Sequence, residues 1–202
     1  GDYRALSVTM LSTHDTTIWQ AWWENEAGTI DEGLFRKKCA QRGIDYTSIS
    51  GKLFDSSRSK HGRLRWLNSI TSSDALAAIL GKRREEIGDF IDMYENTYQE
   101  KEKLWKHLKL SGQIQENANR EAIGAVLKMT LESRAIFCIH LILDWLSLAG
   151  MLKGDTYQYR INTPGTISKS NWSLVMPISL EELLKSKITK EVKEMITSTG
   201  RI

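Results

Sequence analysis

Two short apolar segments with the character of β-strands lie about 120 residues apart, at residues 6–13 and 133–143, and the pattern between them is mainly helical. In the first segment Leu6, Val8 and Met10 alternate with polar residues, which predicts a short buried strand. The second is a continuous apolar run, typical of a strand covered on both faces of an interior parallel sheet. Two such strands cannot close the edges of a sheet, so we expect their neighbouring strands to come from elsewhere.

The length and the cysteine usage narrow the class of protein further. The chain has 202 residues, enough for a substantial core but fewer than the roughly 250 of a complete eight-stranded α/β barrel. The longest apolar run, residues 135–145, contains His140 and Asp144, so we expect no membrane span, and we recognise no signal peptide. Cys39 and Cys138 belong to no CxxC or Cys/His cluster, which argues against a zinc site or a disulfide scaffold and favours the cytoplasm.

The net charge of +3 is too small for a nucleic-acid-binding surface unless the charge is concentrated in one place. Between Gly51 and Trp66 a single acid, Asp55, stands among five basic residues: Lys52, Arg58, Lys60, Arg63 and Arg65. A phosphate-binding patch is one interpretation, and a solvated, mobile lid is the favoured one. We therefore expect no nucleic-acid partner.

Helices are expected along most of the chain, because both prolines fall in its last quarter. Residues 44–73 are the exception, since Ser, Gly and basic residues replace the apolar period there and predict a long loop with short helical pieces. Capping boxes are expected at Thr29–Glu32 and Ser179–Glu182. Apolar periodicity and stop signals predict helices over about residues 16–28, 29–42, 72–80, 82–108, 116–131 and 179–192.

A histidine and an aspartate, His14 and Asp15, follow the first predicted strand, where α/β barrels carry catalytic side chains. Asp15 is equally explained as the cap of the next helix. Tryptophan is in excess, with seven residues, and its flat amphipathic ring is suited to holding a sugar. Three of the seven, Trp19, Trp22 and Trp23, follow at helical spacing and also suit a helix core.

Several ordered blocks carry a family resemblance: "LSTHDTTIWQAWW" near the start and "LDWLSLAG", "YRINTPGT", "NW" and "SLEELL" near the end. Together they resemble the C-terminal portion of the 4-alpha-glucanotransferases of glycoside hydrolase family 77, the amylomaltases or disproportionating enzymes. The resemblance implies a helix-rich α/β fold that holds strands 7 and 8 of a (β/α)8 barrel. Residues 1–43 would form strand 7 and the following helices, residues 44–131 a loop and helical insertion, and residues 132–202 strand 8, a sugar-site loop and the last helix.

The resemblance also implies roles for single residues. Asp15 would be the carboxylate that stabilises the transition state, and the implied substrate-binding residues are Thr13, His14, Trp22, Asp144, Asn162 and Trp172. Other readings stay open: Asn162 as a turn residue, Asp144 as a strand-end cap, and Arg160, which we expect to form a structural salt bridge. The sequence departs from the family pattern where Gln20 and the pair Leu174–Val175 stand in place of expected arginines, and where Leu141 and Leu143 replace Pro and Gln.

The implied reaction is the transfer of α-1,4-glucan segments between maltodextrins by a retaining mechanism, with no metal or organic cofactor. The family's nucleophile and acid/base lie on barrel strands that precede the residues matched here. We therefore expect this chain to be inactive alone and to need the N-terminal remainder of the barrel as well as maltodextrin. The alternatives are a non-catalytic carbohydrate-binding or interaction module and, less favoured, a helical phosphate- or nucleic-acid-binding domain.

Overall fold

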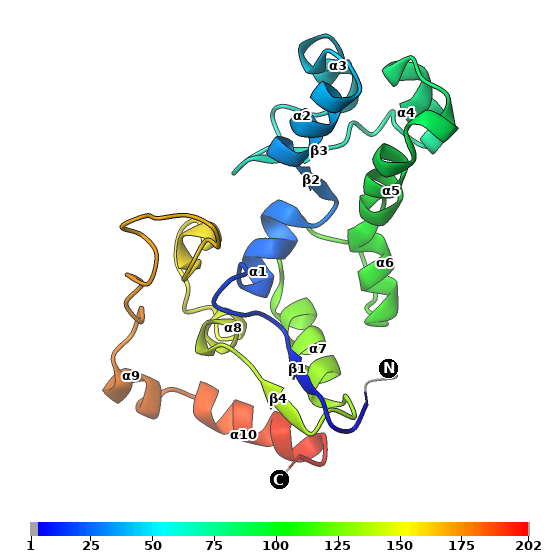
Figure 1. Cartoon of the computed structure of the whole chain (residues 1–202). Coiled ribbons are helices and arrows are strands. Elements are labelled where there is room, and N and C mark those ends of the chain that lie inside the picture. The colour runs from blue at the N-terminus through cyan, green and yellow to red at the C-terminus, as the bar shows by residue number, and fades with distance from the viewer. Residues whose placement is uncertain (1–3, 202) are drawn as a thin grey trace. The chain divides into compact units, whose positions relative to one another are not determined.

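The computed structural model describes residues 4–201, and the chain divides into two compact units (Figure 1). The first unit joins the segment that ends at Glu24 to the segment that begins at Trp105. The second unit is the continuous stretch between them, Asn25–Leu104. The assignment of residues 1–43, 44–131 and 132–202 to parts of a barrel remains a prediction.

The first unit contains two strands that pair in parallel, as expected for neighbouring barrel strands. Val8 lies opposite Phe137 and Met10 lies opposite Ile139. The elements of this unit are β1 (Val8–Met10), α1 (Trp19–Ala21), the π-helix η1 (Trp22–Glu26), which runs into the second unit, α7 (Arg120–Leu131), β4 (Phe137–Ile139), α8 (Ile142–Leu148), the 3₁₀ helix η3 (Thr156–Tyr159), α9 (Leu180–Lys185) and α10 (Ile188–Ser198).

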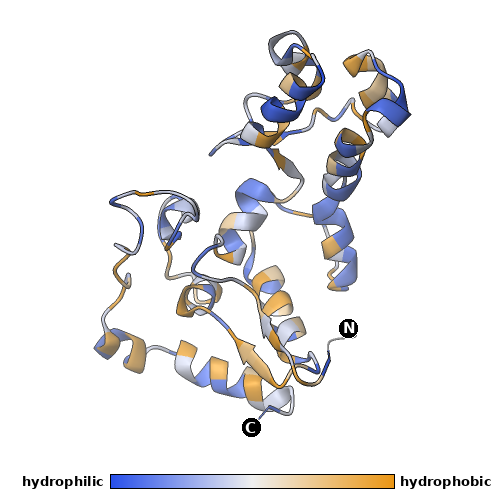
Figure 2. Cartoon of the chain, viewed as in Figure 1, coloured by the Kyte–Doolittle hydropathy of each residue, from blue (hydrophilic) through white to orange (hydrophobic). Residues whose placement is uncertain are grey.

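The prediction that these two strands are buried is wrong for this chain. Leu6 and Phe137 are 87% and 60% exposed, and the other apolar side chains on the same faces are also exposed. Within residues 4–201 the sheet has only these two strands, and Phe137 and Ile139 of β4, the strand coloured orange in Figure 2, are each half or more exposed. Thr9 points the other way and is buried.

Two predicted helices of the first unit begin later than expected. Thr16 closes a turn with Thr13 instead of starting a helix, so α1 begins only at Trp19 and passes into η1. The helix α7 begins after Asn119, whose side chain accepts a hydrogen bond from the Ala122 N–H. Glu116, the predicted start, therefore lies outside it.

The C-terminal helix begins as predicted but does not continue unbroken. Ser179 and Glu182 form the expected capping box at the start of α9. The chain leaves the helix at Ser186 and begins again as α10, so the predicted single helix is two.

A small core holds α1 against α8 and η3 in the first unit. Its buried members are Ile18, Ala21, Leu143, Leu146 and Tyr159. On α7 the buried face includes Ile123, Val126 and Leu127. Since Ile18 and Ala21 come from α1 and its flank, burial of their apolar surface fixes the segment that follows the first strand.

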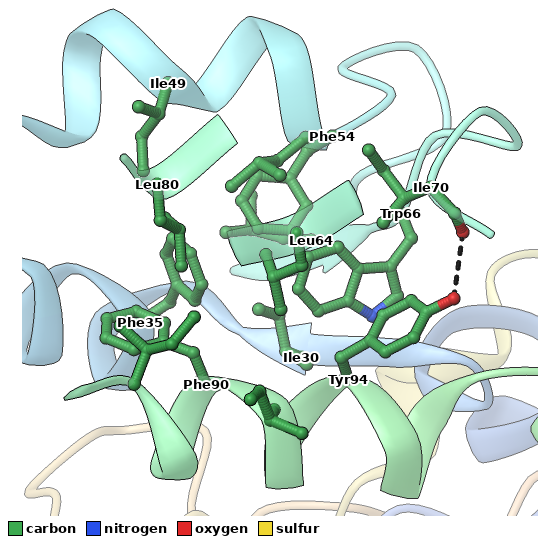
Figure 3. Packing of buried hydrophobic residues seen from close by; sticks show 14 of the residues in the cluster. Ile30, Phe35, Ile49, Phe54, Leu64, Trp66, Ile70, Leu80, Phe90 and Tyr94 are labelled. Atoms are coloured by element: carbon green, nitrogen blue, oxygen red, sulfur yellow. Dashed lines mark hydrogen bonds between the residues drawn. The ribbon is translucent and has the colours of Figure 1, made fainter. Parts of the chain in front are cut away.

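The second unit has its own aromatic core (Figure 3). Phe35 is fully buried and meets Phe54, Trp66 and Phe90 edge to face. The Tyr94 hydroxyl donates to the Ile70 carbonyl at 3.0 Å. The elements here are β2 (Thr29–Asp31), α2 (Glu32–Gln41), α3 (Tyr46–Leu53), β3 (Arg63–Arg65), α4 (Ser73–Leu80), the 3₁₀ helix η2 (Arg84–Glu86), α5 (Gly88–Thr97) and α6 (Glu100–His107), which runs into the first unit.

The interpretation of residues 51–66 as a mobile lid is wrong. Residues 44–73 do contain a short helix, α3, as predicted, but they also supply strand β3, which pairs antiparallel with β2, and Phe54 and Trp66 are core residues. Arg63 donates to Thr29, and Arg65 donates to the Ala27 carbonyl. Two of the five basic residues are therefore held by hydrogen bonds to the chain around β2. The prediction failed because the local sequence pattern does not show these long-range partners.

Of three further helix predictions in the second unit, two are wrong and one is confirmed. Thr29 lies in a strand, so no capping box forms there and the Asp31 side chain caps α2 instead. The single helix predicted from Lys82 is divided, with Gln99 in a left-handed conformation between α5 and α6. The helix α4 and its Ser72 cap agree with prediction.

Candidate functional site

The turn after β1 presents His14 and Asp15 to solvent. The Thr16 N–H donates to the Thr13 carbonyl at 3.2 Å, and the Thr13 N–H donates to the Thr16 hydroxyl at 2.9 Å. The Asp15 N–H donates to the Thr13 hydroxyl at 3.3 Å, so the Thr13 side chain shapes the turn. About half of each of the His14 and Asp15 side chains is exposed.

Asp15 is not the cap of the following helix. The Trp19 N–H, at the start of α1, donates to Asp144 and not to Asp15. The Asp15 Oδ1 atom instead accepts a 2.7 Å hydrogen bond from the Asn162 side-chain amide, 147 positions away in the sequence. The structural reading of Asp15 as an N-cap therefore fails, and its carboxylate stays at the surface.

The segment after η3 holds this turn from the opposite side. The Asn162 N–H donates to the His14 carbonyl at 3.0 Å. The Arg160 guanidinium donates to the carbonyls of Asp15 and Asn162, each at 3.0 Å, instead of forming the salt bridge predicted for it. The turn at residues 13–16 and the segment that carries Arg160 and Asn162 therefore meet in the first unit.

An exposed tryptophan completes the group. The rings of His14 and Trp172 lie 5.0 Å apart between centroids, and His14 Nε2 lies 3.5 Å from Asp15 Oδ2. Trp172 is 65% exposed and adopts a φ of 61°. We call His14, Asp15, Asn162 and Trp172 the Asp15 cluster. A carboxylate, an imidazole and an indole face on one surface provide acceptors for hydroxyl groups and a flat apolar platform, which suits a carbohydrate.

An apolar pocket of about 240 Å³ lies beside the cluster and shares Trp172 with it. Leu174 lines this pocket. Because the pair Leu174–Val175 stands where the family resemblance leads us to expect an arginine, this wall of the pocket is apolar. The remaining lining residues are Leu141, Ile142, Leu143, Ile161 and Met176.

Three of the predicted substrate-binding residues lie outside the cluster: Thr13, which shapes the turn, Asp144 and Trp22. Asp144 is 1% exposed, and its Oδ1 atom accepts hydrogen bonds from the Ser12 hydroxyl and the Trp19 N–H, both at 3.1 Å. Burial raises the pKa of Asp144 to about 6, although both hydrogen bonds oppose the shift. Trp22 is half-buried and packs against Trp19, with ring centroids 6.3 Å apart.

A polar network that the sequence did not reveal surrounds Gln20. Its amide donates to Glu24 at 3.0 Å and accepts from the Ser147 hydroxyl at 2.6 Å. The Thr156 hydroxyl donates to the other Glu24 oxygen at 2.6 Å. Gln20 therefore hydrogen-bonds a neighbouring acid, Glu24, at the position where the family resemblance leads us to expect an arginine. Ser12 is a second residue missed, and the only sequence signal for it was a polar residue at the end of an apolar strand.

Neither a metal site nor an activated thiol is present in the described part of the chain. Within residues 4–201 no three His, Cys, Asp or Glu side chains gather as metal ligands would. Cys138 Sγ lies 3.4 Å from His140 Nε2, but burial raises the pKa of the thiol and lowers the pKa of His140 to about 4. Both groups are therefore neutral near pH 7. None of the helices in these residues has the length and apolar character needed to cross a membrane.

The Asp15 cluster lies beyond the end of a parallel strand and presents a carboxylate, an imidazole and an indole face on one surface. Residues 1–180 match the glycoside hydrolase family 77 family, described as 4-alpha-glucanotransferase, and the chain belongs to this family.

Relatives of the chain carry the same description. It is 37% identical over 110 residues to a 4-alpha-glucanotransferase of Chlamydia pneumoniae, a match that covers 54% of this chain and 20% of the relative. A 4-alpha-glucanotransferase of Chlamydia trachomatis serovar D is 46% identical over 59 residues, which cover 29% of this chain and 11% of that protein. The chain thus spans about a fifth or less of the length of these relatives. No solved structure matches it.

Proposed function

We propose that this chain forms the strand-7 and strand-8 part of the sugar site of a 4-alpha-glucanotransferase, which transfers α-1,4-glucan segments between maltodextrins by a retaining mechanism. The observation that carries the proposal is the Asp15 carboxylate, exposed at the end of a parallel strand and held by the Asn162 amide at 2.7 Å. Family membership over residues 1–180 supports it.

In this proposal Asp15 accepts hydrogen bonds from ring hydroxyls of the reacting sugar. Such bonds strengthen as the ring distorts toward an oxocarbenium ion, and they contribute several kcal/mol to the transition state. His14 donates to the same sugar, and Trp172 provides a stacking face. Asn162 orients the Asp15 carboxylate, while Thr13 shapes the turn beneath it.

A retaining mechanism also needs a nucleophile and an acid/base about 5 Å apart. The matched blocks assign Asp15 alone among the family's three carboxylates, so we propose that the N-terminal remainder of the barrel supplies the other two. Its strands would pair beside β1 and β4, whose apolar faces are exposed here. The free thiols of Cys39 and Cys138 support a cytoplasmic setting.

The first experiment incubates the chain with maltotriose and measures glucose and longer maltodextrins. The expected result is no transfer, and efficient disproportionation by the chain would show that a nucleophile and acid/base lie within it. Quenching of tryptophan fluorescence by maltoheptaose, lost in Trp172→Ala but not in Trp66→Phe, would show sugar binding. Binding without any role in transfer would favour the carbohydrate-binding module.

The second experiment replaces the matching segment of the Chlamydia pneumoniae relative with residues 1–180. If that chimera transfers glucan, Asp15→Asn should lower kcat by two or more orders of magnitude with little change in folding. A chimera that keeps full activity with Asn at position 15 would contradict the role assigned to Asp15.

A further inference from the structure

The two ends of the loop that carries His14 and Asp15 are hydrogen-bonded to one buried oxygen atom, Asp144 Oδ1. The loop comprises residues 13–18, between Ser12 at the end of the strand segment and Trp19 at the start of α1. The Ser12 hydroxyl and the Trp19 N–H both donate to Asp144 Oδ1, each at 3.1 Å. The two ends of the loop are thereby held to the same acceptor.

Asp144 belongs to a helix that is packed into the core of the first unit. Asp144 lies in the first turn of α8 and is flanked by Leu143, which with Leu146 packs against Ile18 in the core of the first unit. Ser12, Trp19 and Asp144 are all buried, so water does not compete for these hydrogen bonds.

The solvent side of the same loop is held by other residues. Asn162 bonds to the His14 carbonyl and the Asp15 carboxylate, and Arg160 bonds to the Asp15 carbonyl. The loop is therefore fixed from two directions, and a shift on the buried side moves Asp15 relative to the Asn162 amide.

We propose that Asp144 is a positioning residue, whose Oδ1 atom clamps Ser12 to Trp19 and so sets where the loop presents His14 and Asp15. Asp144 acts through the loop and does not contact the Asp15 cluster. The clamp is independent of the reaction, whereas its consequence for glucan transfer rests on the proposed function.

The hydrogen bonds of Asp144 all go to one carboxylate oxygen, so a substitution can remove the negative charge and keep the acceptor. The second oxygen, Oδ2, is buried without a hydrogen-bond partner among residues 4–201. Asp144→Asn keeps a carbonyl oxygen for both donors, so it preserves the clamp, whereas Asp144→Ala removes it. Ser12→Ala removes one arm only. Ser147→Ala is the matched control, because it deletes a partly buried hydrogen bond from α8 to Gln20 of α1 that holds neither end of the loop.

The test measures amide hydrogen exchange at Trp19 and the NMR resonances of the Asn162 side-chain amide in the whole chain. In Asp144→Ala, Trp19 should exchange at least about tenfold faster and the Asn162 side-chain signals should shift. Asp144→Asn should restore both, and Ser147→Ala should leave both unchanged. Where Asp144→Ala does not fold, a shift of the Asn162 signals in Ser12→Ala decides the question in the same way.

The proposal is overturned if Asp144→Ala, or Ser12→Ala in its place, leaves both signals as in wild type, or if Ser147→Ala changes them equally. Its failure is distinct from that of the proposed function. Maltoheptaose titration of Asp15→Asn reports on the sugar site, while exchange at Trp19 reports on the clamp with no sugar present. A normal clamp beside a chimera that keeps full activity in Asp15→Asn would contradict the role proposed for Asp15 and leave the clamp standing.

Discussion

Replacing Asp144 by asparagine should change how the stability of the first unit depends on pH. The ordinary pKa of the carboxyl is 3.8, and burial raises it to about 6 in the folded chain. Since the folded state holds its proton more tightly than the unfolded state, its stability is greatest below the unfolded pKa and falls as pH rises through 6. Asparagine does not ionise, so the variant lacks this contribution.

The magnitude follows from the shift. A displacement of about 2 pKa units corresponds to about 3 kcal/mol, most of it lost between about pH 4 and pH 7. The variant leaves an amide where Oδ2 has no partner, which costs some stability, but this cost does not depend on pH. The quantity to compare is therefore the change with pH, not the offset between the two proteins.

The assay is urea unfolding of wild type and Asp144→Asn at a series of pH values, followed at amide resonances of α8, which report on the first unit. The free-energy difference in favour of the variant should grow by about 2–3 kcal/mol between pH 4 and pH 8. His140, whose pKa is lowered to about 4, acts in the opposite direction over the same range, so the wild-type profile alone is not diagnostic. Parallel profiles for the two proteins would refute the reasoning.

Three further outcomes follow from the packing. Phe35→Ala should cost about 3–5 kcal/mol in urea unfolding of the second unit, because the ring is fully buried among four aromatic rings, and a cost below about 1 kcal/mol would contradict that core. Ser72→Ala should lower the same unfolding free energy by about 1 kcal/mol through loss of the α4 cap, whereas Ser72→Asp should retain it. Phe137→Ser should leave the urea-unfolding free energy of the first unit within about 1 kcal/mol, and a large destabilisation would mean that β4 is covered.

Local signals in the sequence predicted what is decided within a few residues. The Ser72 cap of α4 and the Ser179 box of α9 are correct, because a capping side chain reaches a backbone N–H only two or three positions away. The parallel pairing of β1 with β4 is also correct. The ordered blocks were specific enough to identify the family, since several motifs in the same order and at similar spacing are far more specific than any single motif.

Other features depended on partners far away in the sequence. Burial of Phe54 and Trp66 required α2 and α5, so a stretch rich in Ser and basic residues looked like a loop. The role of Asp144 required Ser12, 132 positions earlier. The exposure of β1 and β4 could not be predicted from their apolar pattern. An apolar pattern indicates that a strand face is suited to burial, but not which other segment buries it.

The sequence by itself therefore determined the caps of α4 and α9, the strand pair, the position of His14 and Asp15 after a strand, and the family. Only the tertiary structure decided that Asp15 is free of the helix cap and held by Asn162, while Asp144 takes the cap of α1. The physical reason is that a carboxylate's role depends on which donors and how much water surround it, and folding brings those together over more than a hundred residues.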